Sequence, residues 1–174
     1  MVLETERLRL TAWEASDSIA FRAIASDPDV MRYITDGKPL PDEQAQEFVR
    51  RQIENFATRG FCMWKLLDRS RADTRIIGFC GLQPLIVEGQ SEVEVGWWLA
   101  KDCWGKGLAT EAARTAMGDG FRRVRLRRVV AIARPDNLAS LRVMQKLGMT
   151  YERDLIYKGV PVVLYSIHAA HFIE

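Results

Sequence analysis

A strand-like run at residues 92–99 leads, after five residues, into the turn Gly105-Lys106-Gly107 and then into a helical pattern. The first turn of a helix presents unpaired N–H groups and the positive end of the helix dipole. Glycines at this point let an anion approach the backbone closely. The segment therefore predicts an anion site, although two glycines by themselves fit an ordinary tight turn equally well.

Two familiar phosphate-binding motifs do not fit this turn. A P-loop requires Ser or Thr directly after Gly-Lys, whereas Gly107 follows Lys106 here. The dinucleotide fingerprint requires an acidic residue at the end of the following strand, but that strand ends at Ala133 and continues into Arg134. Both nucleotide-binding classes are therefore disfavoured.

The remaining chain mixes strand and helix patterns in an order typical of α+β proteins. Alternating or apolar runs predict strands at 7–13, 61–67, 75–83, 92–99 and 128–133, with two more after Gly148. Capping and periodic signals predict a short helix from Ser16 to about Pro28 and longer helices at 41–60, 108–122 and 138–147. Residues 28–41 are expected to form a long connection that contains one helical turn.

The helix predicted at 41–60 carries apolar residues at spacings of three, four and seven. Acidic residues crowd its first turn, and Gly60 is expected to end it. We therefore expect its buried face to contain Ala45, Phe48, Val49, Ile53 and Phe56.

Composition favours one compact domain that needs no disulfides. The chain has 174 residues, of which 48% are hydrophobic, and a net charge of +2, without the overall basic signature of a nucleic-acid binder. Its three cysteines form no C-x-x-C pair, which argues for a reducing compartment. The chain begins with acidic residues where a signal peptide is apolar, and no apolar run is long enough to cross a bilayer. We therefore expect a cytoplasmic protein that does not enter membranes.

Three motifs stand in order along nearly the whole chain: ETERLRL at 4–10, WGKGLATEA at 104–112, and NLAS at 137–140 followed by KLG at 146–148. Together they resemble the GNAT superfamily of N-acyltransferases, and within it the RimJ/RimL-like subgroup, which acetylates protein N-termini and small amines. The resemblance implies a single α+β GNAT domain over residues 1–174. Its mixed, mostly antiparallel sheet would splay between strands 92–99 and 128–133, with helices on both faces. The implied activity is direct transfer of an acetyl group from acetyl-CoA to a primary amine, without a metal.

The resemblance also places the cofactor at these motifs. The residues expected to contact acetyl-CoA are Trp97, Trp98, Leu99, Trp104, Gly105, Lys106, Gly107, Leu108, Ala109, Thr110, Asn137 and Ser140. Trp104 stands where the superfamily has Arg or Gln, although RimJ/RimL-like sequences often carry Trp there. Backbone N–H groups near residues 97–99 are expected to meet the developing oxyanion. The glycine at position 96 has two interpretations. It can form a bulge or bend in the strand, or it can relieve close packing against Trp97 or Trp98.

Two residues are candidates for proton transfer. Glu94 lies on the strand before the glycine turn, where family members carry a glutamate that acts as a base through water; Glu94 and Glu92 equally fit the polar face of an alternating strand. Ser140 lies near the cofactor sulfur in the RimJ/RimL-like subgroup and is our candidate for the acid that protonates the departing thiolate. Asn137, expected at the cofactor, is also a favoured helix N-cap. The superfamily's usual acid, a tyrosine seven residues after this asparagine, is replaced by Met144.

Other chemistries fit the sequence less well. Cys103 precedes the turn, but a thiol nucleophile needs an adjacent base, and the histidines His168 and His171 lie at the end of the chain. Their H-x-x-H spacing lacks the third ligand of a metal site. The basic run at 122–128 fits a solvated helix end, with a nucleic-acid-binding or ribosome-binding surface as the alternative.

The acceptor amine stays open between protein N-termini, polyamines, aminoglycosides and amino acids. Because substrate choice is set by the site rather than by the fold, we expect its pocket to be shaped by residues 28–41, with Met31, Tyr33 and Ile34 on their rim, and by the hairpin at 157–159. A non-catalytic CoA-binding sensor is the alternative function, to which the missing tyrosine lends some support. The oligomeric state stays open, a homodimer included.

Overall fold

The computed structural model describes residues 1–34, 37–71 and 75–173. Its first half contains, in chain order, β1 (Val2–Glu4), β2 (Leu8–Thr11), the 3-10 helix η1 (Ala15–Asp17), α1 (Ser18–Ala25), α2 (Pro28–Met31), α3 (Asp42–Arg59), β3 (Met63–Asp68), β4 (Ile76–Val87) and β5 (Gln90–Leu99). Its second half contains η2 (Lys101–Cys103), α4 (Leu108–Arg122), β6 (Arg128–Ala133), α5 (Leu138–Lys146), β7 (Thr150–Tyr157), β8 (Val160–His168) and η3 (Ala169–His171).

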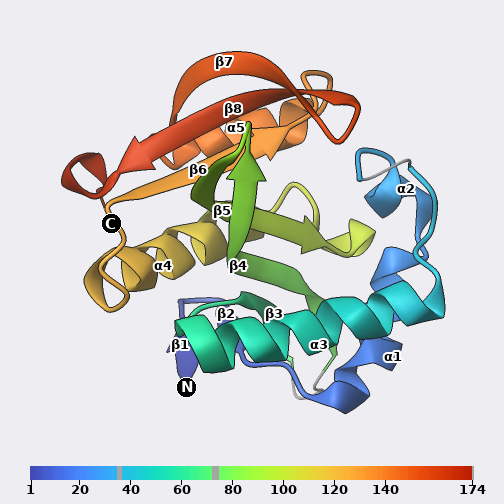
Figure 1. Cartoon of the computed structure of the whole chain (residues 1–174). Coiled ribbons are helices and arrows are strands. Elements are labelled where there is room, and N and C mark those ends of the chain that lie inside the picture. The colour runs from blue at the N-terminus through green and yellow to red at the C-terminus, as the bar shows by residue number, and fades with distance from the viewer. Residues whose placement is uncertain (35–36, 72–74, 174) are drawn as a thin grey trace.

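The strands form one eight-stranded sheet in the order β1-β2-β3-β4-β5-β6-β8-β7. The β5–β6 pair is parallel, and the other neighbouring strands are antiparallel. Figure 1 shows this sheet curving through the centre of the molecule, with helices packed against it. The predicted fold class, a mixed and mostly antiparallel α+β sheet, is confirmed.

Most predicted elements are present, with their ends moved by a few residues. The strand expected at 128–133 is β6 with the same bounds, and the turn of helix expected within 28–41 is α2. The strand expected at 75–83 extends as β4 to Val87, and the short strand β1 was not expected. Residues 35–36 of the long connection lie outside the described residues.

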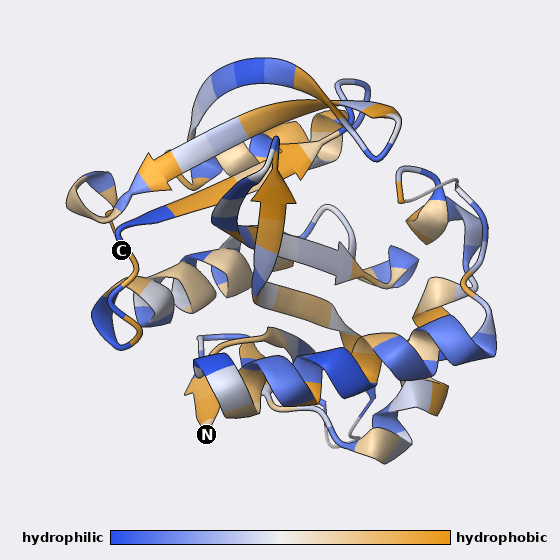
Figure 2. Cartoon of the chain, in the orientation of Figure 1, coloured by the Kyte–Doolittle hydropathy of each residue, from blue (hydrophilic) through white to orange (hydrophobic). Residues whose placement is uncertain are grey.

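Helices cover both faces of the sheet, as expected. On one face, the Phe79 ring of β4 lies 5.7 Å from that of Phe21 in α1 and 4.7 Å from that of Phe48 in α3. On the other face, Leu82 of β4 packs so tightly under α4 that a Cβ on Gly120 would lie 2.5 Å from it. Figure 2 shows the hydrophobic colour along much of β4 and the hydrophilic colour on the outer side of α3.

The predicted buried face of α3 is correct except at one position. Ala45, Phe48 and Val49 are buried and Phe56 packs partly buried against the core, but Ile53 is 38% exposed. Gln52, fully buried, takes its place because the N–H group of Met63, at the start of β3, donates to the Gln52 side-chain oxygen at 3.0 Å. A backbone donor that needs a partner thus places a polar residue on an otherwise apolar helix face.

The sheet opens between β5 and β6, as the resemblance implied. β4 and β5 pair continuously over ten register pairs, from Gly78↔Leu99 to Val87↔Gln90. In contrast, β5 and β6 share the single register pair Glu94↔Val130. The C-terminal part of β5 therefore has one edge without a strand partner, and this edge leads to the glycine turn.

One arginine joins the strands on either side of this opening. Arg128 of β6 donates to Glu92 of β5 at 3.2 Å and to both carboxylate oxygens of Glu152 in β7 at 2.5 and 3.0 Å. Ser166 of β8 donates to the same Glu152 carboxylate at 2.5 Å. Hydrogen bonding to Arg128 lowers the pKa of Glu152 to about 2 despite partial burial. This clamp holds four strands together beside the point where two of them separate.

We expect Arg128→Met to lower the free energy of unfolding at neutral pH by about 2–3 kcal/mol, because two carboxylates that share one cation are left close together. The folded-state pKa of Glu152 is depressed, so its contribution is present above the unfolded value and lost as the pH falls toward about 2. The difference from wild type should therefore shrink in acid. Urea unfolding at several pH values measures it. Arg50→Met, which removes an exposed arginine paired with Glu47 on α3 and away from the clamp, is the control and should change the free energy of unfolding little.

Candidate active site

A cleft of about 440 Å³ lies at the end of β5. Its walls come from α2, the end of β5, the glycine turn with the first turn of α4, and the first turns of α5. The lining residues are Asp29, Val30, Tyr33, Ile34, Trp97, Trp98, Leu99, Cys103, Trp104, Gly105, Gly107, Leu108, Ala109, Thr110, Asn137, Ala139, Ser140, Arg142, Val143 and Lys146. Every residue predicted to contact the cofactor lines this cleft, with the exception of Lys106.

The glycine turn has the geometry that the sequence pattern indicated. Gly105 and Gly107 adopt φ angles of 73° and 79°, in the left-handed region that favours glycine. Gly107 is the N-cap of α4, and no side chain caps this helix end. The first N–H groups of α4, at cleft-lining residues, are thus available to an anion.

The turn is fixed from outside the cleft by the N-terminal motif. Arg7 donates to the Lys106 carbonyl oxygen at 2.8 Å and to the Glu111 carboxylate at 2.7 Å, and Thr5 donates to the same carboxylate at 2.5 Å. Two of the three resembling motifs, far apart in the sequence, therefore touch each other. Because Arg7 pairs with Glu111, the acidic side chain in the first turn of α4 is neutralised beside the anion site.

Trp104, which stands at the position of an arginine or glutamine in the superfamily, joins the turn to the sheet. It is 45% exposed and lines the cleft, and its ring N–H donates to the Leu99 carbonyl oxygen at 2.8 Å. This hydrogen bond ties the residue before Gly105 to the end of β5.

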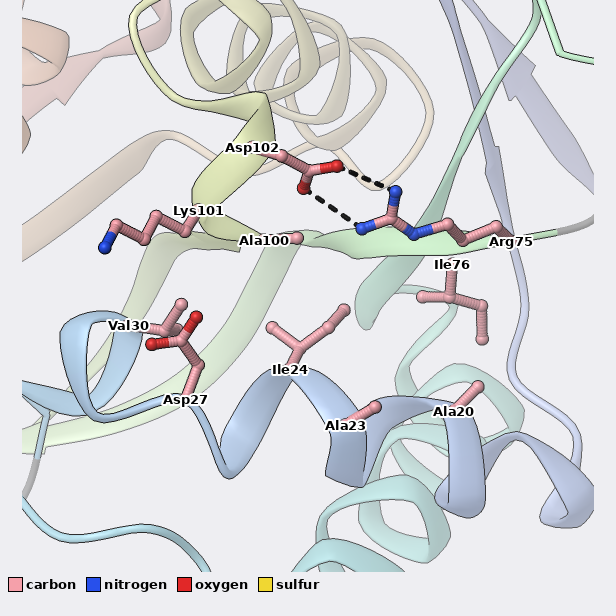
Figure 3. A pocket seen from close by; sticks show the side chains of 10 residues that line it. All are labelled: Ala20, Ala23, Ile24, Asp27, Val30, Arg75, Ile76, Ala100, Lys101 and Asp102. Atoms are coloured by element: carbon pink, nitrogen blue, oxygen red, sulfur yellow. Dashed lines mark hydrogen bonds and ion pairs between the residues drawn. The ribbon is translucent and has the colours of Figure 1, made fainter.

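Two ion pairs hold η2, the segment between β5 and the turn. Arg75 donates to both oxygens of Asp102 at 2.8 and 3.0 Å, and Lys101 lies 2.5 Å from Asp29 of α2. Figure 3 shows the first pair above a groove of about 890 Å³ whose floor is formed largely by apolar side chains of α1. This groove shares Val30 with the cleft and contains none of the predicted site residues.

Asn137 and Ser140 meet at the start of α5. The Asn137 side-chain oxygen accepts a hydrogen bond from the Ser140 backbone N–H at 3.2 Å, so it caps the helix. Both residues are half-buried and line the cleft, so the capping role and the place in the cleft coexist. Met144, one turn further, is 1% exposed and lies in the core rather than in the cleft. The position of the family's usual tyrosine thus points away from the candidate site.

Glu94 lies at the register pair where β5 and β6 separate, next to the cleft but not among its lining residues. It is 9% exposed and accepts a hydrogen bond from Gln83 of β4 at 2.7 Å. Burial raises the pKa of Glu94 to about 7, against the opposing effects of Gln83, the Lys158 charge and the Ile132 backbone amide. The interpretation of Glu94 as a solvent-facing strand residue is therefore wrong. Near neutral pH it is poised to gain or lose a proton.

The bulge considered at Gly96 is absent. The pairing of β4 with β5 continues without a shift through Gly81↔Gly96. A Cβ on Gly96 would lie 2.9 Å from the terminal methyl of Met63, a β3 residue that packs across the sheet. Close packing therefore favours glycine at this position, and the side chain that requires it is that of Met63.

Several residues that line the cleft were not predicted individually from the sequence. Asp29 and Val30 come from α2, and Arg142 and Lys146 lie one turn apart on α5. The i, i+4 spacing of two cations after an N-cap was a usable signal for the second pair. Asp29 and Val30 fall within residues 28–41, which were expected to shape the acceptor pocket, but no local pattern marks these two residues individually.

The structure also describes the residues considered for a thiol nucleophile, a metal site and a basic binding surface. Burial raises the pKa of the Cys103 thiol, which keeps it protonated, and the described residues contain no group of three or more side chains that could hold a metal ion. Within the basic run, Arg123 donates to Asp119 and to the Gly60 carbonyl, and Arg128 forms the clamp described above. Within the described part of the chain, no helix is long and apolar enough to span a membrane.

We expect Gly107→Glu to weaken binding of CoA, the expected cofactor, by about 100-fold or more, because the new carboxylate repels the diphosphate and disturbs its amide donors. Calorimetric titration measures this affinity. Gly89→Glu is the matched control, since Gly89 has a φ of 81°, has open space around its Cβ position and lies outside the cleft. Unchanged affinity in Gly107→Glu would rule out the glycine turn as the diphosphate site.

Comparisons with known proteins agree with this geometry. A model of the acetyltransferase (GNAT) domain family matches residues 7–150. The uncharacterized protein YkkB of Bacillus subtilis is 33% identical over 94% of both chains, and the uncharacterized N-acetyltransferase YnaD of the same organism is 32% identical over 87% of this chain and 84% of its own. The crystal structure of a GNAT-family acetyltransferase from Bacillus anthracis superposes with a TM-score of 0.80 at 26% identity, covering 98% of this chain and 99% of that one. The chain therefore belongs to the GNAT family, whose members are acetyltransferases that take the acetyl group from acetyl-CoA.

Proposed function

We propose that this chain transfers an acetyl group directly from acetyl-CoA to a primary amine, with both substrates bound together. The observation that carries the proposal is the position of the cleft. It extends from the capless N-terminus of α4 to the unpaired edge of β5, and Glu94 lies where that edge begins. The anion site, the unpaired edge of β5 and the buried Glu94 carboxyl group thus lie in this order from the start of α4.

The cleft offers each part of acetyl-CoA a matching surface. The diphosphate suits the amide groups beside Gly105 and Gly107, and the side chains of Arg142 and Lys146 supply positive charge at the same cleft. The pantetheine arm contains amide groups that suit the backbone of residues 97–99, because β6 does not pair with them. The same backbone N–H groups are the proposed donors to the oxyanion.

Glu94 is the proposed base and acts through water. It is 9% exposed and does not line the cleft, so a water molecule is the natural carrier between an acceptor ammonium and this carboxylate. Its pKa of about 7 is close to that of an α-amino group, about 8, and far from that of lysine, about 10.4. Protein N-termini and small amines of low pKa are therefore the favoured acceptors.

Ser140 is the proposed acid for the departing thiolate. Ser140 lines the cleft, whereas Met144, at the family's tyrosine position, is buried in the core. Thr110 and Tyr33 are the other hydroxyl-bearing residues that line the cleft. Of the three, Ser140 is the one beside Asn137 at the N-terminus of α5.

The acceptor side is proposed to be bounded by α2 and the β7–β8 turn. Asp29 of α2 and, directly after this helix, Tyr33 and Ile34 line the cleft, whereas Met31, expected on the same rim, is buried in the core. Lys158, in the second, is close enough to influence the pKa of Glu94. The cleft lining supports the role of the first segment, and the charge effect of Lys158 on Glu94 supports the role of the second, whose residues 157–159 do not line the cleft.

We expect acetyl-CoA-dependent thiol release in the presence of peptides with free N-termini or of small amines. With Nα-acetyl-lysine, whose free amine is the ε-amino group, we expect slower thiol release. A panel of these acceptors with polyamines and aminoglycosides, assayed with a thiol reagent, measures this. Tight CoA binding without turnover on any acceptor would instead favour a CoA-binding sensor.

We expect Glu94→Gln to lower kcat/KM by about 10²- to 10⁴-fold. In the wild type, kcat/KM should fall as the pH drops below about 7, because the base must be ionised, and the variant should lack this dependence. The raised folded-state pKa means that ionisation of Glu94 destabilises the fold as the pH rises through about 7. At mildly alkaline pH the free energy of unfolding of the variant should therefore be no lower than that of the wild type. A lower kcat/KM in the variant then reports loss of the base rather than loss of folded protein. A pH profile that is the same in both proteins would contradict the assignment.

A further inference from the structure

The side chains of Gln83 and Glu94 form a directed pair across two central strands. The residues are register partners in the antiparallel β4–β5 ladder, so their side chains lie on the same face of the sheet. The Gln83 side-chain N–H donates to Oε2 of Glu94 at 2.7 Å. Gln83 is half-buried and Glu94 is 9% exposed, so water competes little for this contact.

Three other groups face the Glu94 carboxyl from neighbouring elements. Lys158 reaches it as a charge from the β7–β8 turn, and the Ile132 backbone amide reaches it from β6. Along β5, the Glu92 side chain is paired with Arg128. Among the described residues, Gln83 is the one side chain that hydrogen-bonds to Glu94.

We propose that Gln83 is a positioning residue for acetyl transfer, which holds one carboxylate oxygen of Glu94 and sets the pH range over which Glu94 accepts the proton of the acceptor amine. This inference rests on the proposed role of Glu94 as the base. In that step an N–H bond of the acceptor ammonium breaks, the proton passes through water to the Glu94 carboxylate, and the freed amine lone pair forms the C–N bond at the thioester carbonyl. The C–S bond then breaks as the oxyanion returns its electron pair, and the thiolate leaves with a proton from the proposed acid Ser140. Gln83 takes no part in bond making, since its amide only donates to the carboxylate.

The direction in which Gln83 shifts the pKa of Glu94 follows from the negative charge of the Glu94 carboxylate, which accepts the hydrogen bond. A hydrogen bond to a carboxylate stabilises the ionised form, and burial opposes ionisation. When the Gln83 donor is removed, one of the interactions that stabilise the ionised carboxylate is lost, so the effect of burial becomes larger and the pKa of Glu94 rises. Hydrogen bonds to charged groups are strong enough for a shift of about one pH unit. A merely structural contact would change stability or kcat without moving the pH dependence.

The test is Gln83→Met, which keeps the length of the side chain and removes the donor. Two quantities are measured: the pKa of Glu94 by carbon-13 NMR of its labelled carboxyl, assigned with Glu94→Gln, and the pH profile of kcat/KM. We expect both to move upward together by about one pH unit, so that the rate falls several-fold below neutral pH and little in alkali. Gln90→Met, at an exposed position of the next strand, is the control and should move neither.

A second variant keeps the inference testable if Gln83→Met folds poorly. Gln83→Glu places two carboxyl groups at hydrogen-bond distance, and such a pair shares one proton, so the apparent pKa should rise further. An unchanged Glu94 pKa in both variants would overturn the positioning role. A shifted NMR pKa with an unshifted rate profile would overturn Glu94 as the base, and would leave the Gln83 contact as a structural one.

Discussion

The parallel pairing of β5 with β6 stops after the single register pair Glu94↔Val130, and the rest of the molecule is arranged around this split. On one side of it, the Arg128 clamp joins β5, β6 and β7 through carboxylates. On the other side, β5 runs on with one free edge into a glycine turn that opens α4. A strand edge inside a domain is normally paired, so an unpaired one beside a cleft is a place for a ligand with its own amide groups.

The same split explains the state of Glu94. The residue lies where two strands begin to diverge, so its carboxyl is removed from bulk water yet still reached by the Ile132 amide and by Gln83. Burial raises its pKa to about 7, against the opposing effects of Gln83, the Lys158 charge and the Ile132 amide. Such a group lowers stability when it is ionised, which is a common feature of groups retained for chemistry rather than for folding.

Local signals were sufficient for much of the fold. The glycine turn was predictable because Gly105 and Gly107 stand between a strand pattern and a helical pattern, and the bounds of β6 followed from its apolar run. The features that sequence reasoning missed depend on distant partners. Ile53 is displaced from the core because Gln52 accepts a hydrogen bond from a β3 backbone group. The contact of Gln83 with Glu94 is formed only because the β4–β5 register places the two residues opposite each other. The motifs identified the cleft, but tertiary packing determines which polar groups face each other in it.

A crystal structure of the chain with bound CoA tests the role of the split most directly. We expect the diphosphate on the amide groups of the glycine turn and the pantetheine arm along residues 97–99, with its sulfur between Ser140 and the Glu94 end of β5. The β5–β6 pairing should remain confined to the Glu94↔Val130 pair. A β5–β6 ladder that closes along the cleft, or CoA bound in the groove beside Arg75 and Asp102, would contradict this assignment.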